Sequence, residues 1–167
     1  MMPQTAHQHS YKVEKIAQPN WYWAAAGVTV RNHYSLPETF SQCRLASILL
    51  NRRECCEDCD ACNVTFSLER TLRAMGHFAS KATGGLDCVD AGEITGRGDL
   101  VILQRAAASA GGPKRFYALF NSSMNPMSPT TYDTYIGDVQ TGLVQTRPHR
   151  PHDVIAAEMR YITQLGR

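Results

Sequence analysis

The segment from Trp21 to Tyr34 constrains the fold most, because it is apolar on nearly every side. Asn20 precedes it and is suited to cap a helix, since an asparagine side chain accepts a hydrogen bond from an unpaired backbone N–H of the first turn. The small residues from Ala24 to Gly27 allow a second layer to approach closely. A helix without a polar face is normally buried. We therefore expect a fold built around a central helix.

Two more helices are predicted in the first half of the chain, at residues 41–50 and 67–76. Ser41 and Ser67 are suitable N-caps, and Gly76 is a typical helix stop. Apolar residues recur at helical spacing in both segments. Three stretches without this pattern are expected to be a loop, a charged cysteine-rich loop and a polar linker, at residues 36–40, 51–63 and 78–87.

The second half of the chain changes character. Four short apolar segments predict strands, at residues 100–104, 116–120, 135–139 and 143–146. Loops rich in Gly, Ser and Pro are expected at 106–113 and 121–131, and an amphipathic helix at 153–165. Helices followed by antiparallel strands are typical of an α+β fold. We expect a flexible N-terminal tail, residues 1–15, and a single domain, residues 16–167.

Composition excludes several classes of function. The net charge of the 167 residues is +2, and no basic run exceeds two residues, so nothing favours nucleic acid as a partner. No apolar run approaches the roughly 18 residues of a membrane span. The first residues are polar and lack the apolar core of a signal peptide. We expect a cytoplasmic protein, or one secreted without a visible signal peptide.

The segment Trp21-Tyr22-Trp23-Ala24-Ala25 resembles the active-site opening of papain-like cysteine peptidases, in particular the bacterial AvrRpt2-like group. That group typically has a cysteine between the two tryptophans. Its other motifs are matched in the same order by Gln42-Cys43, Cys55-Cys56, Cys62-Asn63 and Gly96-Arg97-Gly98. The resemblance spans about residues 16–145. It implies a papain-like fold, in which a helical half with a central helix is followed by a small twisted antiparallel sheet.

The resemblance implies three catalytic positions, and two of them hold residues that cannot do the chemistry. Tyr22 stands at the nucleophile position, where the reaction needs a cysteine thiolate. Arg115 stands at the histidine position, and arginine stays protonated, so it cannot act as a general base. Asp138 matches the residue that orients the catalytic histidine. Gln18 matches the glutamine that lines the oxyanion hole. We expect Arg115 to pair with Asp138, and Tyr22 to contact one of them, in a closed pseudo-active site.

A peptidase-like fold that lacks the catalytic nucleophile predicts a protein that acts by binding. The partner would be a protein or peptide, and the chain a non-catalytic subunit, a regulatory partner of an active paralogue, or part of a larger assembly. The groove of such a fold accepts an extended peptide. The expected binding residues are aromatic residues and a methionine near the cleft, namely Trp21, Trp23, Met124, Tyr132 and Tyr135.

Two alternatives remain open. One is an active cysteine-type peptidase or acyl transferase with a rebuilt site, whose thiolate would come from Cys59 or Cys88. The other is a cysteine-rich zinc or redox module. Its metal ligands would be four cysteines in one loop, Cys55, Cys56, Cys59 and Cys62. The alternatives to zinc are disulfides between these cysteines, or cysteines that stay as reduced thiols. The leading hypothesis needs no cofactor.

Overall fold

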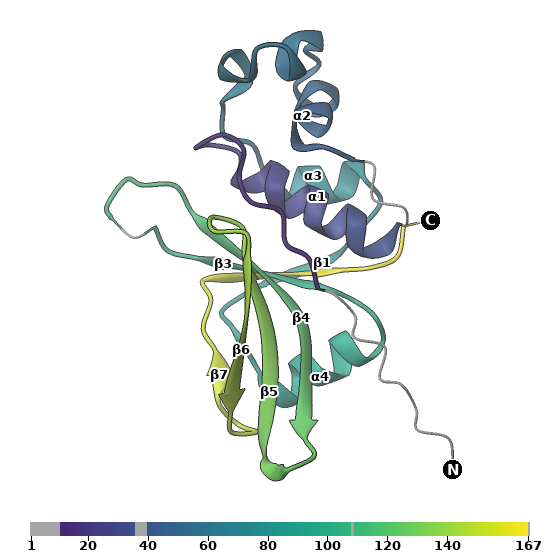
Figure 1. The fold of residues 1–167 in the computed structure, drawn as a ribbon, viewed down its shortest axis with the longest axis vertical. Coiled ribbons are helices and arrows are strands. Elements are labelled where there is room, and N and C mark those ends of the chain that lie inside the picture. The colour runs from purple at the N-terminus through teal and green to yellow at the C-terminus, as the bar shows by residue number, and fades with distance from the viewer. Residues whose placement is uncertain (1–10, 36–39, 108, 167) are drawn as a thin grey trace.

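The computed structural model describes residues 11–35, 40–107 and 109–166, and it shows an α+β fold (Figure 1), which confirms the predicted fold class. None of the helices in the described part of the chain is long and apolar enough to span a membrane. The helices are α1 (Tyr22–Tyr34), α2 (Gln42–Leu50), α3 (Leu68–Ala74) and α4 (Cys88–Gly96), with two 3-10 helices, η1 (Arg53–Cys56) and η2 (Cys59–Cys62).

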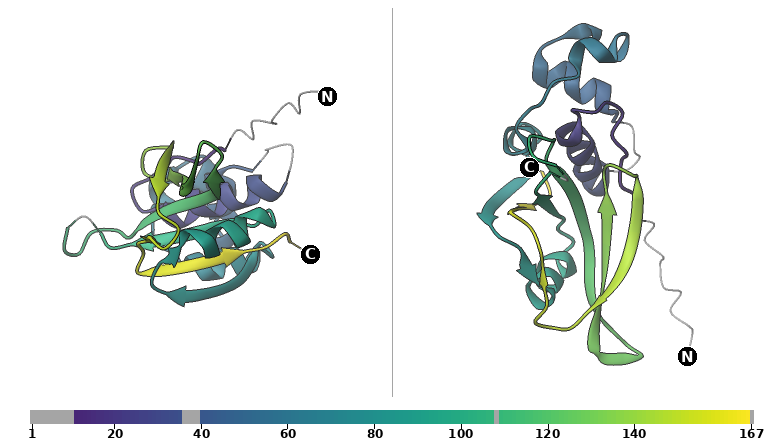
Figure 2. Two further views of the ribbon diagram at one scale, coloured as in Figure 1. Left: turned by 90° about the horizontal axis from the view of Figure 1, so that it is seen from below. Right: turned by 90° about the vertical axis from the view of Figure 1, so that its left-hand side faces the viewer.

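Six strands form one antiparallel sheet in the order β1-β8-β3-β4-β5-β6. Their bounds are β1 Phe78–Thr83, β8 Met159–Thr163, β3 Val101–Arg105, β4 Arg115–Asn125, β5 Ser128–Asp138 and β6 Leu143–His149. Two short strands, β2 (Leu86–Asp87) and β7 (Val154–Ile155), pair separately. One face of the sheet packs against α1 and α3, and the other against α4. In Figure 2, α4 and the segment that leads into α1 lie on opposite sides of the sheet.

The central helix α1 is buried from Tyr22 to Val30, as its apolar sequence predicts. Its N-cap residue is Trp21, whereas the sequence pointed to Asn20. Asn20 is engaged elsewhere, because its backbone N–H donates to Asn63 Oδ1 at 2.9 Å and its Nδ2 donates to the Asn63 carbonyl at 3.1 Å. The asparagine therefore ties the start of α1 to the cysteine-rich segment.

The caps of the next two helices follow the sequence pattern. Ser41 accepts a hydrogen bond from the Arg44 N–H at 3.3 Å, and Ser67 accepts one from the Arg70 N–H at 3.2 Å. Gly76 follows α3 with φ of +77°, a left-handed conformation that glycine adopts without steric cost. Local residue chemistry was sufficient to locate α2 and α3.

Four segments differ from the sequence prediction. The expected linker at 78–87 forms β1 and β2, the expected loop at 121–131 lies mostly in the long β4–β5 hairpin, and α4 was not foreseen. The expected C-terminal helix at 153–165 instead forms β7 and β8. Tyr161 and Thr163 are buried while Ile162 between them is less so, which is the period-2 pattern of a strand. Pairing of β8 with both β1 and β3 decided this conformation.

The end of the expected N-terminal tail belongs to the domain. Val13 is buried, and the Glu14 N–H donates to Thr29 Oγ1 in α1 at 2.9 Å. The Ile16 N–H donates to the carbonyl of Val139 at 2.8 Å. Residues 11–15 therefore run in extended form beside α1 and the end of β5, while residues 1–10 lie outside the described residues.

Candidate functional site

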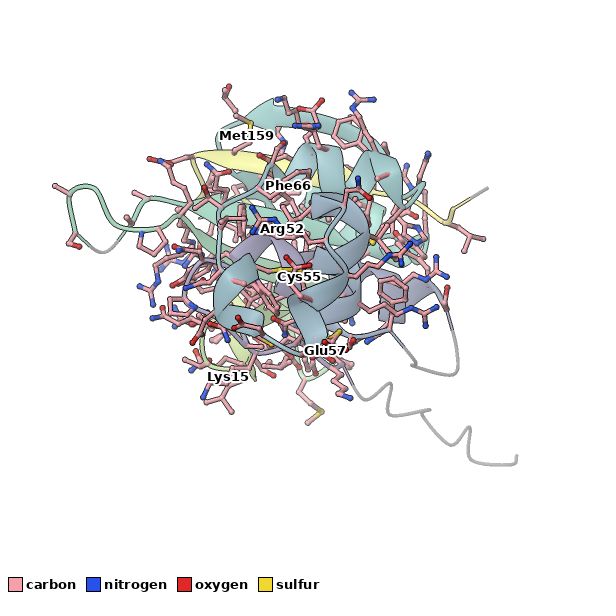
Figure 3. All side chains as sticks on the ribbon, turned by 90° about the horizontal axis from the view of Figure 1, so that it is seen from above. Lys15, Arg52, Cys55, Glu57, Phe66 and Met159 are labelled. Atoms are coloured by element: carbon pink, nitrogen blue, oxygen red, sulfur yellow. A yellow bond between two sulfur atoms is a disulfide. The ribbon has the colours of Figure 1, made fainter. Side chains whose placement is uncertain are left out.

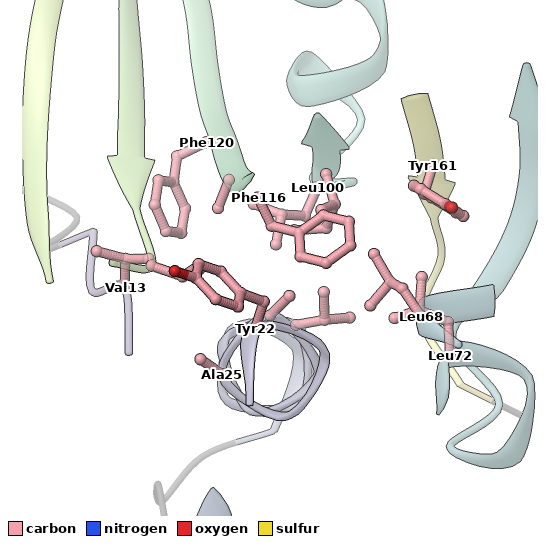
Figure 4. Close-up of a cluster of buried hydrophobic side chains, with 14 residues drawn as sticks. Val13, Tyr22, Ala25, Leu68, Leu72, Leu100, Phe116, Phe120 and Tyr161 are labelled. Carbon is pink, nitrogen blue, oxygen red and sulfur yellow. The ribbon is translucent and has the colours of Figure 1, made fainter. Parts of the chain in front are cut away.

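Tyr22 begins α1 and directs its ring to the sheet. Only 8% of the residue is exposed, and it belongs to a buried cluster with Val13, Phe116, Phe120 and Val139. Figure 4 shows the ring between Val13 and Phe116, on the side of α1 that faces the strands. The residue at the predicted nucleophile position is therefore a packing residue of the core.

Arg115 and Asp138 lie on the other face of the sheet. Side chains alternate along a strand, so Phe116 faces α1 while Arg115 and Tyr117 face away from it. Asp138 pairs with Tyr117 across β4 and β5, and paired residues share a face. The expected contact of Tyr22 with Arg115 or Asp138 was therefore wrong, because the β-sheet separates these side chains.

The expected ion pair between Arg115 and Asp138 was also wrong. Arg115 Nη2 donates to Gln140 Oε1 at 2.9 Å. Asp138 Oδ1 accepts a hydrogen bond from the backbone N–H of Gln140 at 2.8 Å, which closes the turn after β5. Both side chains thus bond to Gln140, and the salt bridges found among the described residues do not include this pair.

The positions that do face Tyr22 are apolar. Phe116 and Val139 each follow a predicted catalytic residue by one position, and both lie in the cluster that contains Tyr22. Their backbones meet at the end of the sheet, where the Val139 N–H donates to the Phe116 carbonyl at 3.4 Å. Because successive side chains of a strand point to opposite faces, a residue and its neighbour one position along face opposite sides of the sheet. These three side chains offer hydrocarbon and one phenol, and no general base.

The two tryptophans expected to bind a partner are structural, so this expectation was wrong for them. Trp21 and Trp23 are buried, and their indole N–H groups donate to the carbonyls of Cys62 at 2.7 Å and Val64 at 2.9 Å. Buried indoles normally find such partners. Gln18 lies one turn before α1, half-buried, and its carbonyl accepts the Trp21 N–H at 3.0 Å.

The structure brings together two of the other expected binding residues. Met124 of β4 pairs with Tyr132 of β5, so both point to the face that carries α4. Met124 is 52% exposed. Tyr135 points to the opposite face, where its ring centroid lies 5.3 Å from that of Tyr11. The end of the hairpin that carries Met124 is remote from α1 (Figure 1), so it does not border a cleft at Tyr22.

Four of the six cysteines form disulfides, Cys43–Cys56 and Cys55–Cys62. They fasten α2, η1 and η2 into a cap at one end of the molecule, which Figure 3 views from above with Cys55 labelled. Three of the four proposed zinc ligands are thus bonded to sulfur. Over residues 11–35, 40–107 and 109–166, no group of three or more His, Cys, Asp or Glu side chains is arranged to hold a metal ion.

Cys59 and Cys88, the thiols proposed for a rebuilt enzyme, differ in setting. Cys88 is buried at the first position of α4, and its thiol donates to the Asp153 carbonyl, with 3.6 Å from Sγ to oxygen. Burial raises the pKa of Cys88, so its thiol stays protonated at neutral pH. Cys59 is half-buried in η2. The environment of Cys88 is the reverse of what a nucleophilic cysteine needs.

A pocket that the sequence did not reveal lies on the sheet face opposite α1, beside β7. It has a volume of about 330 Å³. Its polar lining comes from four strands and the turn between β5 and β6, as Arg105, Arg115, Asp138, Thr141, Gln145, Arg147 and His149. The alternation of Leu143, Gln145, Arg147 and His149 along β6 was the available sequence signal, but the register of the neighbouring strands was needed to assemble the site.

Two regions therefore stand out, an apolar cluster at the start of α1 and a cationic pocket on the far face of the sheet. The first consists of packed apolar side chains, and the second is lined by three arginine side chains. Comparison of the chain with protein-family models and with curated proteins gave no match.

Proposed function

We propose that this chain is a catalytically inactive papain-like protein that acts by binding a protein or a peptide. The observation that carries the proposal is the packing of Tyr22 with Phe116 and Val139 in one buried cluster. In a papain-like peptidase, the start of the central helix and the facing ends of two strands supply the catalytic groups. In this chain, the start of α1, the start of β4 and the residue after β5 supply side chains that pack together, which supports the proposal.

The side chains packed around Tyr22 lack the groups that peptide hydrolysis needs. The reaction needs a thiolate near a helix N-terminus and an imidazole within hydrogen-bond reach. Tyr22 has no sulfur, Phe116 has no titratable group, and the cluster leaves little space for a substrate carbonyl. The buried thiol of Cys88 is protonated at neutral pH, which weakens the rebuilt-enzyme alternative.

Exposed apolar side chains on the sheet face opposite α1 support the binding role. Met124, Leu143 and Val154 are 52%, 61% and 64% exposed. Methionine and aliphatic groups of this kind suit an adaptable contact with a partner. A subunit of this type would work beside an active paralogue or within a larger assembly. The two disulfides favour the secreted alternative, because such bonds persist in oxidising compartments.

Labelling with an electrophilic cysteine-peptidase probe tests the inactive site. The wild-type chain should show no covalent adduct on any cleft residue. The variant Tyr22→Cys/Phe116→His/Val139→Asp places thiol, imidazole and carboxylate on side chains that face one another, and it should react. Tyr22→Cys/Arg115→His is the matched control, and it should stay unreactive because Arg115 points to the other face. An adduct on wild-type Cys59 or Cys88, with peptide hydrolysis, would overturn the proposal.

Selection from a displayed random-peptide library tests the binding role. Peptides selected on the wild-type chain should lose tenfold or more in affinity for Leu143→Glu/Val154→Glu, which replaces exposed apolar contacts by charges. Ile48→Glu changes a residue of similar exposure on α2, outside the sheet, and should bind normally. Failure to select any peptide, or equal affinity for both variants, would count against this surface as the binding site.

A further inference from the structure

The pocket beside β7 is lined with positive charge. Arg105, Arg115 and Arg147 contribute three guanidinium groups, against one carboxylate, that of Asp138. The strand register places these residues on one face of the sheet. Arg105 pairs with Arg115 across β3 and β4, and the β6 residues that line the pocket share one face of the sheet. The three guanidinium groups and the one carboxylate together carry a net charge of about +2.

Each arginine uses only part of its donor capacity within the protein. Arg105 Nε donates to the Ala156 carbonyl at 2.9 Å, and its guanidinium carbon lies 4.5 Å from the centre of the Tyr117 ring. Arg147 Nη2 donates to Gln145 Oε1 at 3.1 Å. A guanidinium has five N–H donors. The contacts fix the orientation of the side chains and leave donors for a ligand.

Two buried nitrogen atoms at the pocket have no hydrogen-bond partner in the described part of the chain. They are Arg115 Nε and His149 Nε2. Buried polar atoms are nearly always paired in proteins, so an unpaired one requires an explanation. Both residues line the same pocket, but the register places them at different ends of it, because His149 pairs with Tyr132 whereas Tyr117, two residues from Arg115, pairs with Asp138. A small ligand that accepts hydrogen bonds would therefore pair at the end where Arg105 and Arg115 lie side by side.

We propose that this pocket binds a small oxyanion, a carboxylate or a phosphate, that carries an apolar group. Arginine recognises both anions through paired N–H donors. The apolar part of the ligand would lie against Tyr117, Ile136, Leu143 and Ile155, which complete the lining. The volume of about 330 Å³ lies at the lower end of ligand pockets, which suits a single ring or one side chain of a peptide. A cation is excluded by repulsion from three arginines.

The pocket shares Leu143 and Val154 with the proposed partner-binding surface, but anion binding does not depend on the inactive site, because the pocket lies on the sheet face opposite Tyr22. Isothermal titration of the full chain with phenylacetate, phenyl phosphate and benzyl alcohol tests it at low salt. Both anions should bind, and the neutral alcohol should bind at least tenfold more weakly. The tighter of the two anions identifies the preferred oxyanion. Amide chemical shifts should change in β6 and β7. Equal binding of all three compounds would overturn the proposal.

Variants separate the pocket from the overall charge of the chain. Arg115→Gln should weaken anion binding tenfold or more, because it removes a charge and the unpaired Nε. Arg53→Gln makes the same change in charge on an exposed residue of η1 and should alter binding less than twofold. Arg147→Gln, at an exposed position, provides a second test should the first variant fold poorly. Equal losses in Arg53→Gln and in the pocket variants would show non-specific attraction and contradict the site.

Discussion

The indole N–H of Trp21 donates to the carbonyl of Cys62 across 2.7 Å in the protein interior. Trp21 stands at the start of α1, and Cys62 ends η2 and is bonded to Cys55. Together with the bonds from Asn20 to Asn63 and from Trp23 to Val64, this bond joins the start of the central helix to the cysteine-rich segment. This relationship gives the cysteine-rich segment a structural role, which is to hold the start of α1.

Replacing Trp21 by Phe should lower the free energy of unfolding by about 2–3 kcal/mol, because it removes a buried hydrogen bond and leaves a cavity where the indole packs. The Cys62 carbonyl then keeps only its bond from the Val64 N–H, at 2.8 Å. Urea denaturation measures this change. Trp23→Phe is the matched control. It removes a bond to the Val64 carbonyl, but Val64 is partly exposed, so water can replace the lost donor and the loss should be smaller. Equal losses for the two variants would contradict the special role of Trp21.

The disulfides predict a definite thiol count. Alkylation of the unfolded chain without reductant should modify two of the six cysteines, Cys59 and Cys88. Replacing both Cys55 and Cys62 by Ala should lower the free energy of unfolding by about 2–4 kcal/mol, since the unfolded chain gains freedom. Peptide mapping by mass spectrometry checks the pairing. Modification of all six residues, or stoichiometric zinc in the purified protein, would contradict this pairing.

Gly137 is required where the N-terminal segment crosses β5. A Cβ atom there would lie 2.7 Å from Val13 Cβ and 3.0 Å from the Phe120 ring. Gly137→Ala should therefore lower the free energy of unfolding by about 1–3 kcal/mol through overpacking. Gly96→Ala in α4 is the control, because an added Cβ meets nothing within 4 Å, and it should be neutral or stabilising. Thermal denaturation distinguishes the two, and equal melting temperatures would refute the close approach.

His77 predicts how stability depends on pH. The residue is 3% exposed, and one ring nitrogen bonds to the Gln164 carbonyl at 2.9 Å. Burial lowers the pKa of His77, against the opposing effect of that hydrogen bond, and nearby Arg31 lowers it further. In the unfolded chain, the pKa is about 6.5. Below that pH the unfolded state binds more protons, so stability should fall as the pH drops from 6.5 toward the lower folded pKa.

Urea denaturation at pH 7.5 and pH 5.5 tests this effect. The wild-type chain should lose stability between the two values, and His77→Gln, which does not titrate, should lose less. His152→Gln removes an exposed histidine and should keep the wild-type dependence. An identical pH dependence in the wild type and in His77→Gln would show that His77 is not responsible.

Local patterns in the sequence were enough to predict much of the helical half. The apolar run of α1 and the serine caps of α2 and α3 are properties of neighbouring residues, and the structure confirms these helices. The apolar centres of β3, β4 and β5 were also recognised. Met124 and Tyr132 were predicted as binding residues of a loop, whereas the structure pairs them across β4 and β5.

Tertiary structure decided the conformation of 153–165 and the faces of Arg115 and Asp138. The apolar residues of β8 are compatible with either a helix or a strand. Hydrogen-bonded pairing with β1 on one side and β3 on the other stabilises the strand. The sequence alone determined α1 and the absence of a cysteine at its start. Strand register decided which side chains face Tyr22 and which line the cationic pocket, because a shift of one residue moves a side chain to the opposite face of a sheet.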